Sequence, residues 1–298
     1  MRKLIILAVV GLAAQLVDGS LGMGYGVTSS TLLVLAGLTP AAASASVHFS
    51  ELGTNLVSGL SHWKLRNVDW RVVARIAGPG AVGAFLGATV LSRVSTAFAA
   101  PLMSAILAAL GVYIIVRFVL GMRPRLKTAL TLKFLAPLGL FAGFVDATGG
   151  GGWGPVATPA LLVDGRMQPR QVIGSVDTAE LAVSVAASLG FLVGLGSAGI
   201  NWGFALALLV GGLVAAPLAA QLIRVAPAHL LGVAVGGVIL LTNSRTLLKS
   251  VDASDSARFA VYGVILLVTA AGLAVAVRRA RRAPAASTDA RVEEPVSV

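Results

Sequence analysis

The chain has 298 residues, of which 57% are hydrophobic and 12% are charged, and its mean hydropathy is +0.90. Soluble globular domains carry about 25% charged residues, so this composition excludes an ordinary soluble domain and indicates a polytopic membrane protein. The net charge of +11 comes largely from Lys and Arg between and after the apolar segments, where basic residues set membrane orientation, so it does not indicate nucleic-acid binding. The chain has no cysteine, which excludes disulfides and thiolate metal sites.

The sequence contains an internal repeat. A shift of 128 residues pairs Asp18 with Asp146 and aligns DGSLGMGYG with DATGGGGWG. After one inserted residue, Glu51 pairs with Glu180. Glycines in apolar sequence coincide by chance, whereas acidic residues inside apolar segments rarely do. We therefore predict an all-α membrane protein built from two repeats.

The predicted elements follow in chain order. Repeat 1 covers residues 1–121, with a broken segment at 3–37 and helices at 41–60, 71–91 and 98–120. After a linker at 122–132, repeat 2 covers 133–248, with a broken segment at 133–164 and helices at 170–194, 202–222 and 228–243. One extra transmembrane helix is expected at 257–279, followed by a disordered polar tail at 283–298.

The basic residues predict how the repeats lie in the membrane. Lys64, Arg66 and Arg71 place the loop after 41–60 in the cytoplasm, and the uncharged loop near 195–201 is expected outside. These assignments agree only if the two repeats are inverted and each broken segment begins and ends on one side. Segments of this length scarcely allow two full crossings, so we expect a hairpin of two short helices, re-entrant or barely spanning.

Each break predicts a binding function. Unwound backbone at membrane depth is tolerated where it is buried in protein or lines a watery cavity, and a helix restarting there presents free N–H groups and a positive dipole end. Two such helix N-termini meeting near the midplane would form an anion site, although the glycines could instead only permit tight packing. The predicted substrate-binding residues are Gly22, Gly24, Tyr25, Gly26, Thr28 and Ser29 in the first break, and Gly150, Gly152, Trp153, Gly154 and Thr158 in the second.

The helix after each break carries polar residues at steps of three and four, which places them on one face. This polar stripe comprises Ser44, His48, Glu51, Asn55 and Ser58 in repeat 1, and Asp177, Glu180, Ser184 and Ser188 in repeat 2. Ionisable groups within transmembrane helices usually face a pathway or a partner, so Glu51 and Glu180 are candidate proton carriers; the alternative is interhelical hydrogen bonding.

The role of the two aspartates stays open at this stage. Asp18 and Asp146 either cap the helix breaks or carry a coupling proton or cation. Together with them, the predicted coupling and pathway residues are His48, Glu51, Asn55, Asp177 and Glu180. The three histidines show no metal-ligand spacing, so neither a metal site nor a cofactor is predicted.

The chain resembles the sulfite exporter TauE/SafE family, also called the 4-toluene sulfonate uptake permease family, over roughly residues 5–250. Four motifs carry the resemblance: VDGSLGMGYGVTSSTLL, ASASVHFSELGTNLVSGLSHW, VDATGGGGWGPVATPALL and IGSVDTAELAVSVAASLGF. The resemblance implies a multi-pass transporter of the bacterial inner membrane that carries sulfite, sulfonates or related sulfur-containing anions and is coupled to protons.

The leading hypothesis is therefore a secondary transporter whose two inverted halves give alternating access to a small anion. Its expected partners are the anion, protons and membrane lipid, with no nucleic acid. The alternatives are a carrier of another small anion, such as a carboxylate, and a non-transport accessory protein of the membrane. An enzyme is not expected, because no convergent nucleophile or metal set is found. The direction of transport and the formation of a homo-oligomer stay open.

Overall fold

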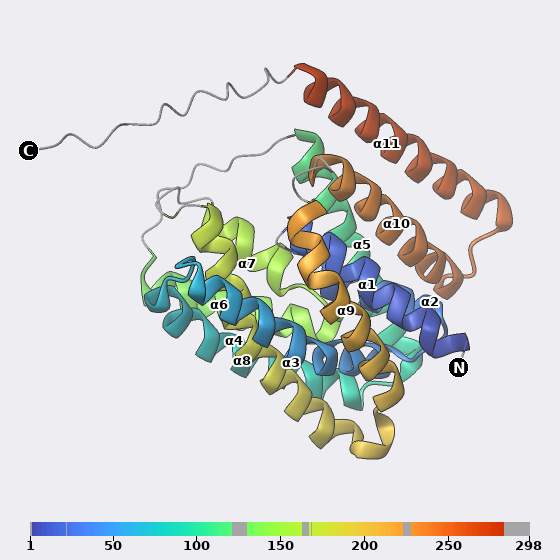
Figure 1. Cartoon of the computed structure of the whole chain (residues 1–298). Coiled ribbons are helices and arrows are strands. Elements are labelled where there is room, and N and C mark those ends of the chain that lie inside the picture. The colour runs from blue at the N-terminus through green and yellow to red at the C-terminus, as the bar shows by residue number, and fades with distance from the viewer. Residues whose placement is uncertain are drawn as a thin grey trace, which may run out of the picture.

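The computed structural model describes residues 2–21, 23–120, 130–162, 167, 169–222 and 228–282. These residues form helices joined by short connections, and no strand occurs among them (Figure 1). Five of the described helices are long and apolar enough to cross a membrane: α4 (Trp70–Arg93), α5 (Thr96–Leu120), α6 (Leu132–Gly149), α8 (Pro169–Leu195) and α11 (Asp255–Arg282). The prediction of an all-α polytopic membrane protein is confirmed.

Each segment that the sequence analysis treats as broken consists of two helices. The first is α1 (Arg2–Leu21) followed by α2 (Tyr25–Leu35), and the second is α6 followed by α7 (Trp153–Leu162). At the first break Gly24 has a φ of 121°, and at the second Gly150 and Gly151 have φ values of 70° and 144°. Side chains disfavour these backbone angles, so the glycines are what lets the chain turn within so few residues.

Side-chain caps start the helices that follow the first break. The α3 helix (Pro40–Lys64) begins with Pro40 at its first position, and the Thr39 hydroxyl accepts a hydrogen bond from the Ala42 N–H at 3.3 Å. The Asp69 carboxylate caps α4 in the same way, accepting from the Arg71 N–H at 2.9 Å. These caps set where α3 and α4 begin. The α3 helix packs against α8 (Figure 1).

The helices before the two breaks pack in equivalent ways on helices of the opposite repeat. The α1 helix lies along α9 (Trp202–Leu222), and α6 lies along α4. A Cβ atom on Gly11 of α1 would collide with the backbone carbonyl of Leu208, and one on Gly139 of α6 would lie 2.5 Å from the Ile76 carbonyl oxygen. Gly11 and Gly139 are 128 residues apart, the shift that relates the two breaks. The inversion of the repeats relative to the membrane stays a prediction.

Two hydrophobic cores result, and each combines helices from both halves of the chain. One core includes Ile76 of α4, Trp153 of α7 and Phe191 of α8. The other includes Leu33 of α2 and Leu208 of α9. The α3 helix supplies buried residues to both cores. This helix therefore joins the two packing units at the centre of the molecule.

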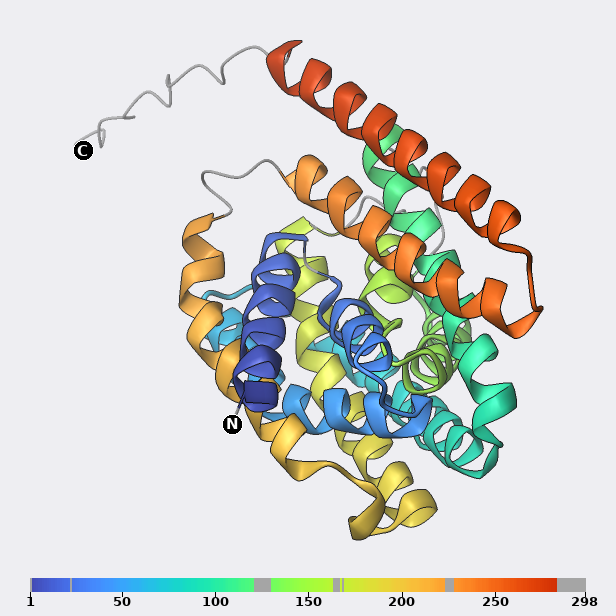
Figure 2. The same cartoon turned by 90° about the vertical axis from the view of Figure 1, so that its right-hand side faces the viewer.

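The α10 (Ala228–Ser250) and α11 helices lie side by side at one edge, with α10 against α5 (Figure 2). The sequence analysis expects a helix at 228–243, a segment short enough for it to extend past these ends, and α10 continues to Ser250. The helix continues because the Asn243 amide is buried and donates hydrogen bonds to the Thr31 hydroxyl at 3.0 Å and to the Ile239 carbonyl at 2.8 Å. Packing against α2 therefore compensates for the polarity of this turn.

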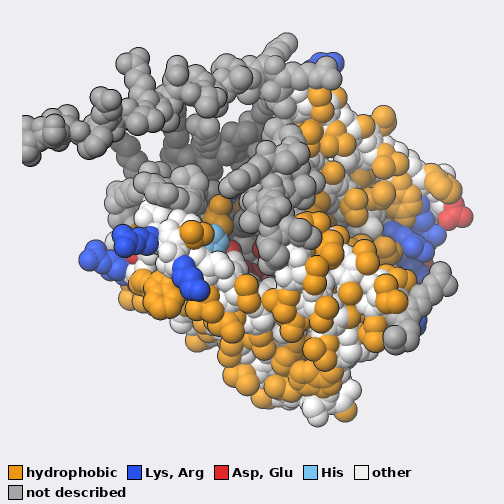
Figure 3. Space-filling model, in the orientation of Figure 1, with side chains coloured by type: hydrophobic (Ala, Val, Ile, Leu, Met, Phe, Trp, Pro, Cys, Tyr) orange, Lys and Arg blue, Asp and Glu red, His pale blue; other side chains and the backbone are white. Residues whose placement is uncertain are grey.

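The outer surface suits a lipid environment. Hydrophobic side chains cover much of the face in Figure 3, with Lys and Arg gathered toward its left and right margins. On α11, Phe259 and Leu267 are 75% and 72% exposed, which in water would be unfavourable. The predicted tail at 283–298 and most of the predicted linker at 122–132 lie outside the described residues.

The close contact between α4 and α6 can be tested by substitution of a glycine at the contact. A Cβ atom on Gly143 would collide with the backbone carbonyl of Gly80, which cannot move without displacing the helix. We expect Gly143→Ala to reduce the stability of the purified protein by about 1–3 kcal/mol, the usual effect of overpacking, measured as a lower melting temperature in detergent. The control is Gly263→Ala on α11, where a Cβ meets nothing within 4 Å. Equal melting temperatures for the two variants would contradict the packing described.

Candidate functional site

The two helix breaks touch each other at the backbone. A Cβ atom on Gly26 would lie 2.7 Å from the Gly151 Cα, and one on Gly151 would collide with the Val27 nitrogen. The Ser30 hydroxyl donates a hydrogen bond to the Gly150 carbonyl across the same contact. The N-terminal turn of α2 is thereby joined to the loop between α6 and α7.

Both aspartates of the repeated motif bind the helix that restarts after their break. The Asp18 Oδ1 accepts from the Tyr25 N–H at 3.2 Å. The Asp146 Oδ1 accepts from the Gly152 N–H at 2.8 Å and the Trp153 N–H at 3.1 Å. Of the two roles considered for these residues, capping is therefore observed, whereas a role in coupling stays a prediction.

The first residue of each restarting helix is a buried aromatic anchor. The Tyr25 hydroxyl lies 3.0 Å from the Ser50 hydroxyl and donates to the Leu208 carbonyl at 3.3 Å. The Trp153 indole N–H donates to the Val176 carbonyl at 3.0 Å. Because both rings are buried among helices, they fix the angle at which α2 and α7 leave the breaks.

A buried cluster of ionisable groups lies beside the contact of the breaks. The His48 Nδ1 is 2.9 Å from the Glu51 Oε2 and 3.9 Å from the Asp146 Oδ2, and all three side chains are at most 2% exposed. Glu51 also borders the break, since a Cβ atom on Gly26 would be 3.2 Å from its Oε1. The Asp146 Oδ2 and the His48 Nε2 have no hydrogen-bond partner among the described residues.

This cluster is suited to hold a proton or a cation. Two carboxylates and one imidazole buried together are stable only if protons or a bound cation balance their charge. Ligand atoms of His48, Glu51 and Asp146 lie within 4.8 Å of one another, a spacing at which one metal ion could also be held. The sequence analysis considers only the spacing of histidines and does not predict this arrangement, because Asp146 joins the other two through tertiary packing.

The polar stripe of α3 continues from the cluster along α8. The Ser184 hydroxyl donates to the Glu51 Oε2 at 3.2 Å, and the Asn55 amide donates to the Ser184 hydroxyl at 3.3 Å. Farther along α3, the Ser58 hydroxyl donates to the Asp177 Oδ2 at 2.9 Å. Together these bonds form a line of polar contacts between α3 and α8.

Not all predicted coupling residues join the cluster. The Asp177 carboxylate pairs with Ser58 and lies 3.4 Å from the His62 Nε2. Glu180 is partly buried on α8, and its carboxylate interacts electrostatically with Glu51 and Asp146. The structure therefore brings His48, Glu51 and Asp146 into direct contact, and Glu180 of α8 lies within electrostatic range of Glu51 and Asp146.

Hydroxyl groups gather on the first turns of α2. The Thr28 Oγ1 and the Ser29 Oγ are buried without a hydrogen-bond partner among the described residues. Gly154 and Thr158 are buried on α7, whereas Gly22 lies outside the described residues. The predicted site residues do not include Ser30, which bridges the breaks, or Arg117, whose guanidinium donates to the Met23 sulfur at 3.1 Å. No spacing in the sequence pairs either residue with its partner.

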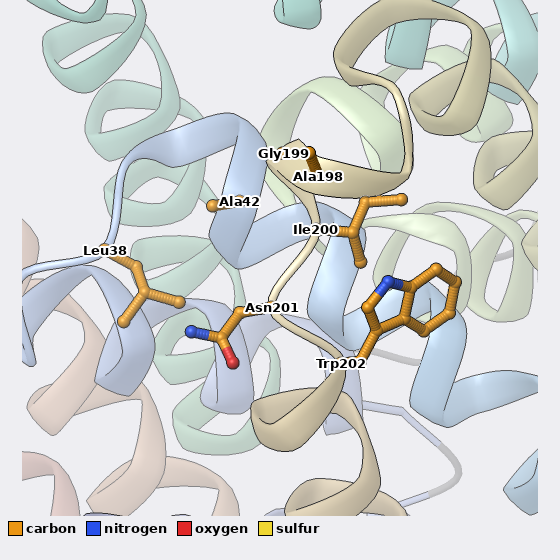
Figure 4. A pocket seen from close by; sticks show the side chains of 7 residues that line it. All are labelled: Leu38, Ala42, Ala198, Gly199, Ile200, Asn201 and Trp202. Carbon is orange, nitrogen blue, oxygen red and sulfur yellow. The ribbon is translucent and has the colours of Figure 1, made fainter.

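A separate pocket of about 380 Å³ lies at the other end of α2, between the turn into α3 and the loop before α9 (Figure 4). Its lining includes Leu38, Ala42, Asn201 and Trp202. The pocket follows the C-terminal end of α2, whereas the breaks meet at its N-terminal end, about 16 Å away along eleven residues of helix. It therefore does not belong to the site at the breaks.

The apolar helices, the two helix breaks in contact and the buried ionisable cluster beside them are features of a multi-pass membrane transporter. The chain belongs to the sulfite exporter TauE/SafE family, whose model matches residues 7–246. It is also 48% identical over 268 residues to the "Probable membrane transporter protein YtnM" of Bacillus subtilis (strain 168), covering 89% of each chain. No solved structure matches the chain. Both descriptions are of transporters, which points away from an enzyme.

The caps at the breaks generate a prediction for Asp146. Asn retains an oxygen that can accept from the Gly152 and Trp153 N–H groups, whereas Ala removes the cap. We expect Asp146→Ala to lower stability by about 1–2 kcal/mol and Asp146→Asn to lower it less, measured by thermal unfolding in detergent. Asp252→Asn in the exposed turn before α11 serves as the control. If Asn destabilises as much as Ala, capping is not the structural role of Asp146.

Proposed function

We propose that the chain is a secondary transporter of small sulfur-containing anions, such as sulfite or organosulfonates, and that protons drive it. The observation that carries the proposal is the backbone contact between the two helix breaks beside the buried His48–Glu51–Asp146 cluster. One location then offers donors for an anion and groups that can hold a proton. This combination is what coupled transport of an anion requires.

The N-terminal turn of α2 is the proposed anion site. Its first N–H groups lack helical acceptors, and its dipole favours negative charge. The buried hydroxyls of Thr28 and Ser29 supply further donors that have no partner among the described residues. The sulfur oxyanion is proposed because the family is described as a sulfite exporter.

The cluster is the proposed coupling site. Glu51 has one carboxylate oxygen beside Gly26 and the other beside His48, so it faces both the anion position and the cluster. A negative charge on Glu51 repels an incoming anion, whereas a proton there removes the repulsion. Binding of the anion and binding of the proton would thereby favour each other.

Alternating access is the proposed mechanism. Each hydrophobic core combines helices from both repeats, and α3 contributes to both cores. Rocking of one packing unit against the other around the contact of the breaks would expose the anion site first to one side of the membrane and then to the other. The proposed inversion of the repeats would make the two end states equivalent in architecture.

A small carboxylate is the second candidate substrate, because helix N–H groups and hydroxyls bind carboxylate oxygens as readily as sulfite oxygens. A non-transport accessory protein would need neither the contact of the breaks nor a buried ionisable cluster beside it.

A flux assay tests this function. The purified protein is placed in liposomes, and sulfite, an organosulfonate and a small carboxylate are compared under an imposed pH gradient. We expect the two sulfur anions to move faster than the carboxylate and the flux to follow the gradient. Glu51→Gln keeps the size and hydrogen-bonding capacity of the side chain but cannot carry the proton, so we expect at least a tenfold loss of gradient-driven flux.

Asp252→Asn is the matched control, because it removes an exposed acidic group outside the transmembrane bundle. It should transport as the wild type does. The proposal fails if none of the three anions moves under the gradient. Proton coupling at Glu51 fails if Glu51→Gln keeps both the rate and the pH dependence of the wild type. Flux that requires a metal ion and ignores the pH gradient would assign the cluster to a metal ion instead.

A further inference from the structure

Arg117 lies on the last turn of α5 and reaches the first helix break. Its guanidinium donates to the thioether sulfur of Met23 at 3.1 Å. Met23 directly precedes Gly24, the residue that caps α2. The positive charge of Arg117 is therefore held next to the chain segment that leads into the proposed anion site.

The bonding of Arg117 is weak for an arginine in this setting. A thioether is a weak acceptor, and it uses one of the five N–H donors of a guanidinium. The guanidinium also interacts with the Tyr113 hydroxyl, a neutral partner, and lies over the face of the Phe118 ring, whose centroid is 5.7 Å away. No carboxylate among the described residues lies within ion-pair distance of this guanidinium. Arg117 is also only partly buried.

An arginine with spare donors is suited to sulfur oxyanions. The planar guanidinium donates two parallel N–H bonds to two oxygens of one group, which sulfite and sulfonates both present. Met23 is easily displaced as an acceptor, because an anionic oxygen binds a guanidinium far more strongly than a thioether does. An anion could replace the Met23 sulfur as the hydrogen-bond acceptor of the guanidinium while Arg117 stays in place.

We propose that Arg117 binds the anionic group of the substrate at the first break. In the absence of substrate, the Met23 sulfur accepts the hydrogen bond of the guanidinium. This inference rests on the proposed transport of sulfur anions and adds a residue that determines affinity. Arg117 contacts Met23 immediately before Gly24, so its donors and those of the N-terminal turn of α2 lie at neighbouring positions of the first break.

The test compares three variants in the same proteoliposomes, with sulfite and an organosulfonate as probes. We expect Arg117→Gln to raise KM about 10- to 100-fold, the effect of losing a charged hydrogen bond, with a smaller change in maximal rate. Arg117→Lys should recover part of the affinity, because it keeps the charge but not the two-pronged geometry. Arg71→Gln is the charge control, because it also removes a positive charge. Arg71 is exposed at the start of α4, which is predicted to lie at the cytoplasmic side. It should keep the wild-type KM.

Met23→Leu separates binding from a structural role. If Arg117 only anchors the break through Met23, Met23→Leu should reproduce the effect of Arg117→Gln. If Arg117 binds the anion, Met23→Leu should leave KM within about threefold of wild type, because Leu fills a similar volume and frees the guanidinium. An unchanged KM in Arg117→Gln, or equal losses in Met23→Leu and Arg117→Gln, overturns the inference while transport by the wild type still stands. A wild-type protein that moves no anion overturns the proposed function and this inference with it.

Discussion

The contact between Gly26 and Gly151 is the constraint on which the site depends. Two interrupted segments, far apart in the chain, approach until their backbones touch, and a single Cβ atom at either glycine would force them apart. Asp18 and Asp146 hold the first N–H groups of the helices that restart there, and Ser30 bonds across to the opposite loop. The arrangement places one helix N-terminus, two hydroxyls without a partner in the described part of the chain and a buried ionisable cluster within one small region.

The two halves of the chain share a scaffold but not the same chemistry. Equivalent aromatic residues, Tyr25 and Trp153, anchor the two restarting helices, and each lies against a glycine of the opposite repeat. The ionisable positions differ, because the counterpart of His48 in repeat 2 is Asp177. His48 approaches Glu51 and Asp146, whereas Asp177 pairs with Ser58. In the proposed mechanism a single cluster therefore couples the proton, even though the sequence is repeated.

Periodicity and the internal repeat could predict the helical class, the two breaks and the polar face of α3. Steps of three and four residues place His48 and Glu51 on one face, and the structure shows them 2.9 Å apart. Contacts between distant helices could not be predicted. The approach of Asp146 to His48 and of Arg117 to Met23 depends on how helices pack, which no local pattern encodes. The helix expected at 228–243 extends to Ser250 in the structure, and the burial of the Asn243 side chain against α2 that accompanies this is a tertiary effect.

The central claim is that the two breaks form one anion site, and an experimental structure with a bound substrate tests it most directly. The protein would be imaged in lipid nanodiscs with sulfite or an organosulfonate, and separately without it. The account predicts density for the anion at the first turn of α2, within hydrogen-bond distance of the Ser29 hydroxyl and close to Glu51. An anion bound away from both breaks, or breaks that are separated from each other in both structures, would contradict it.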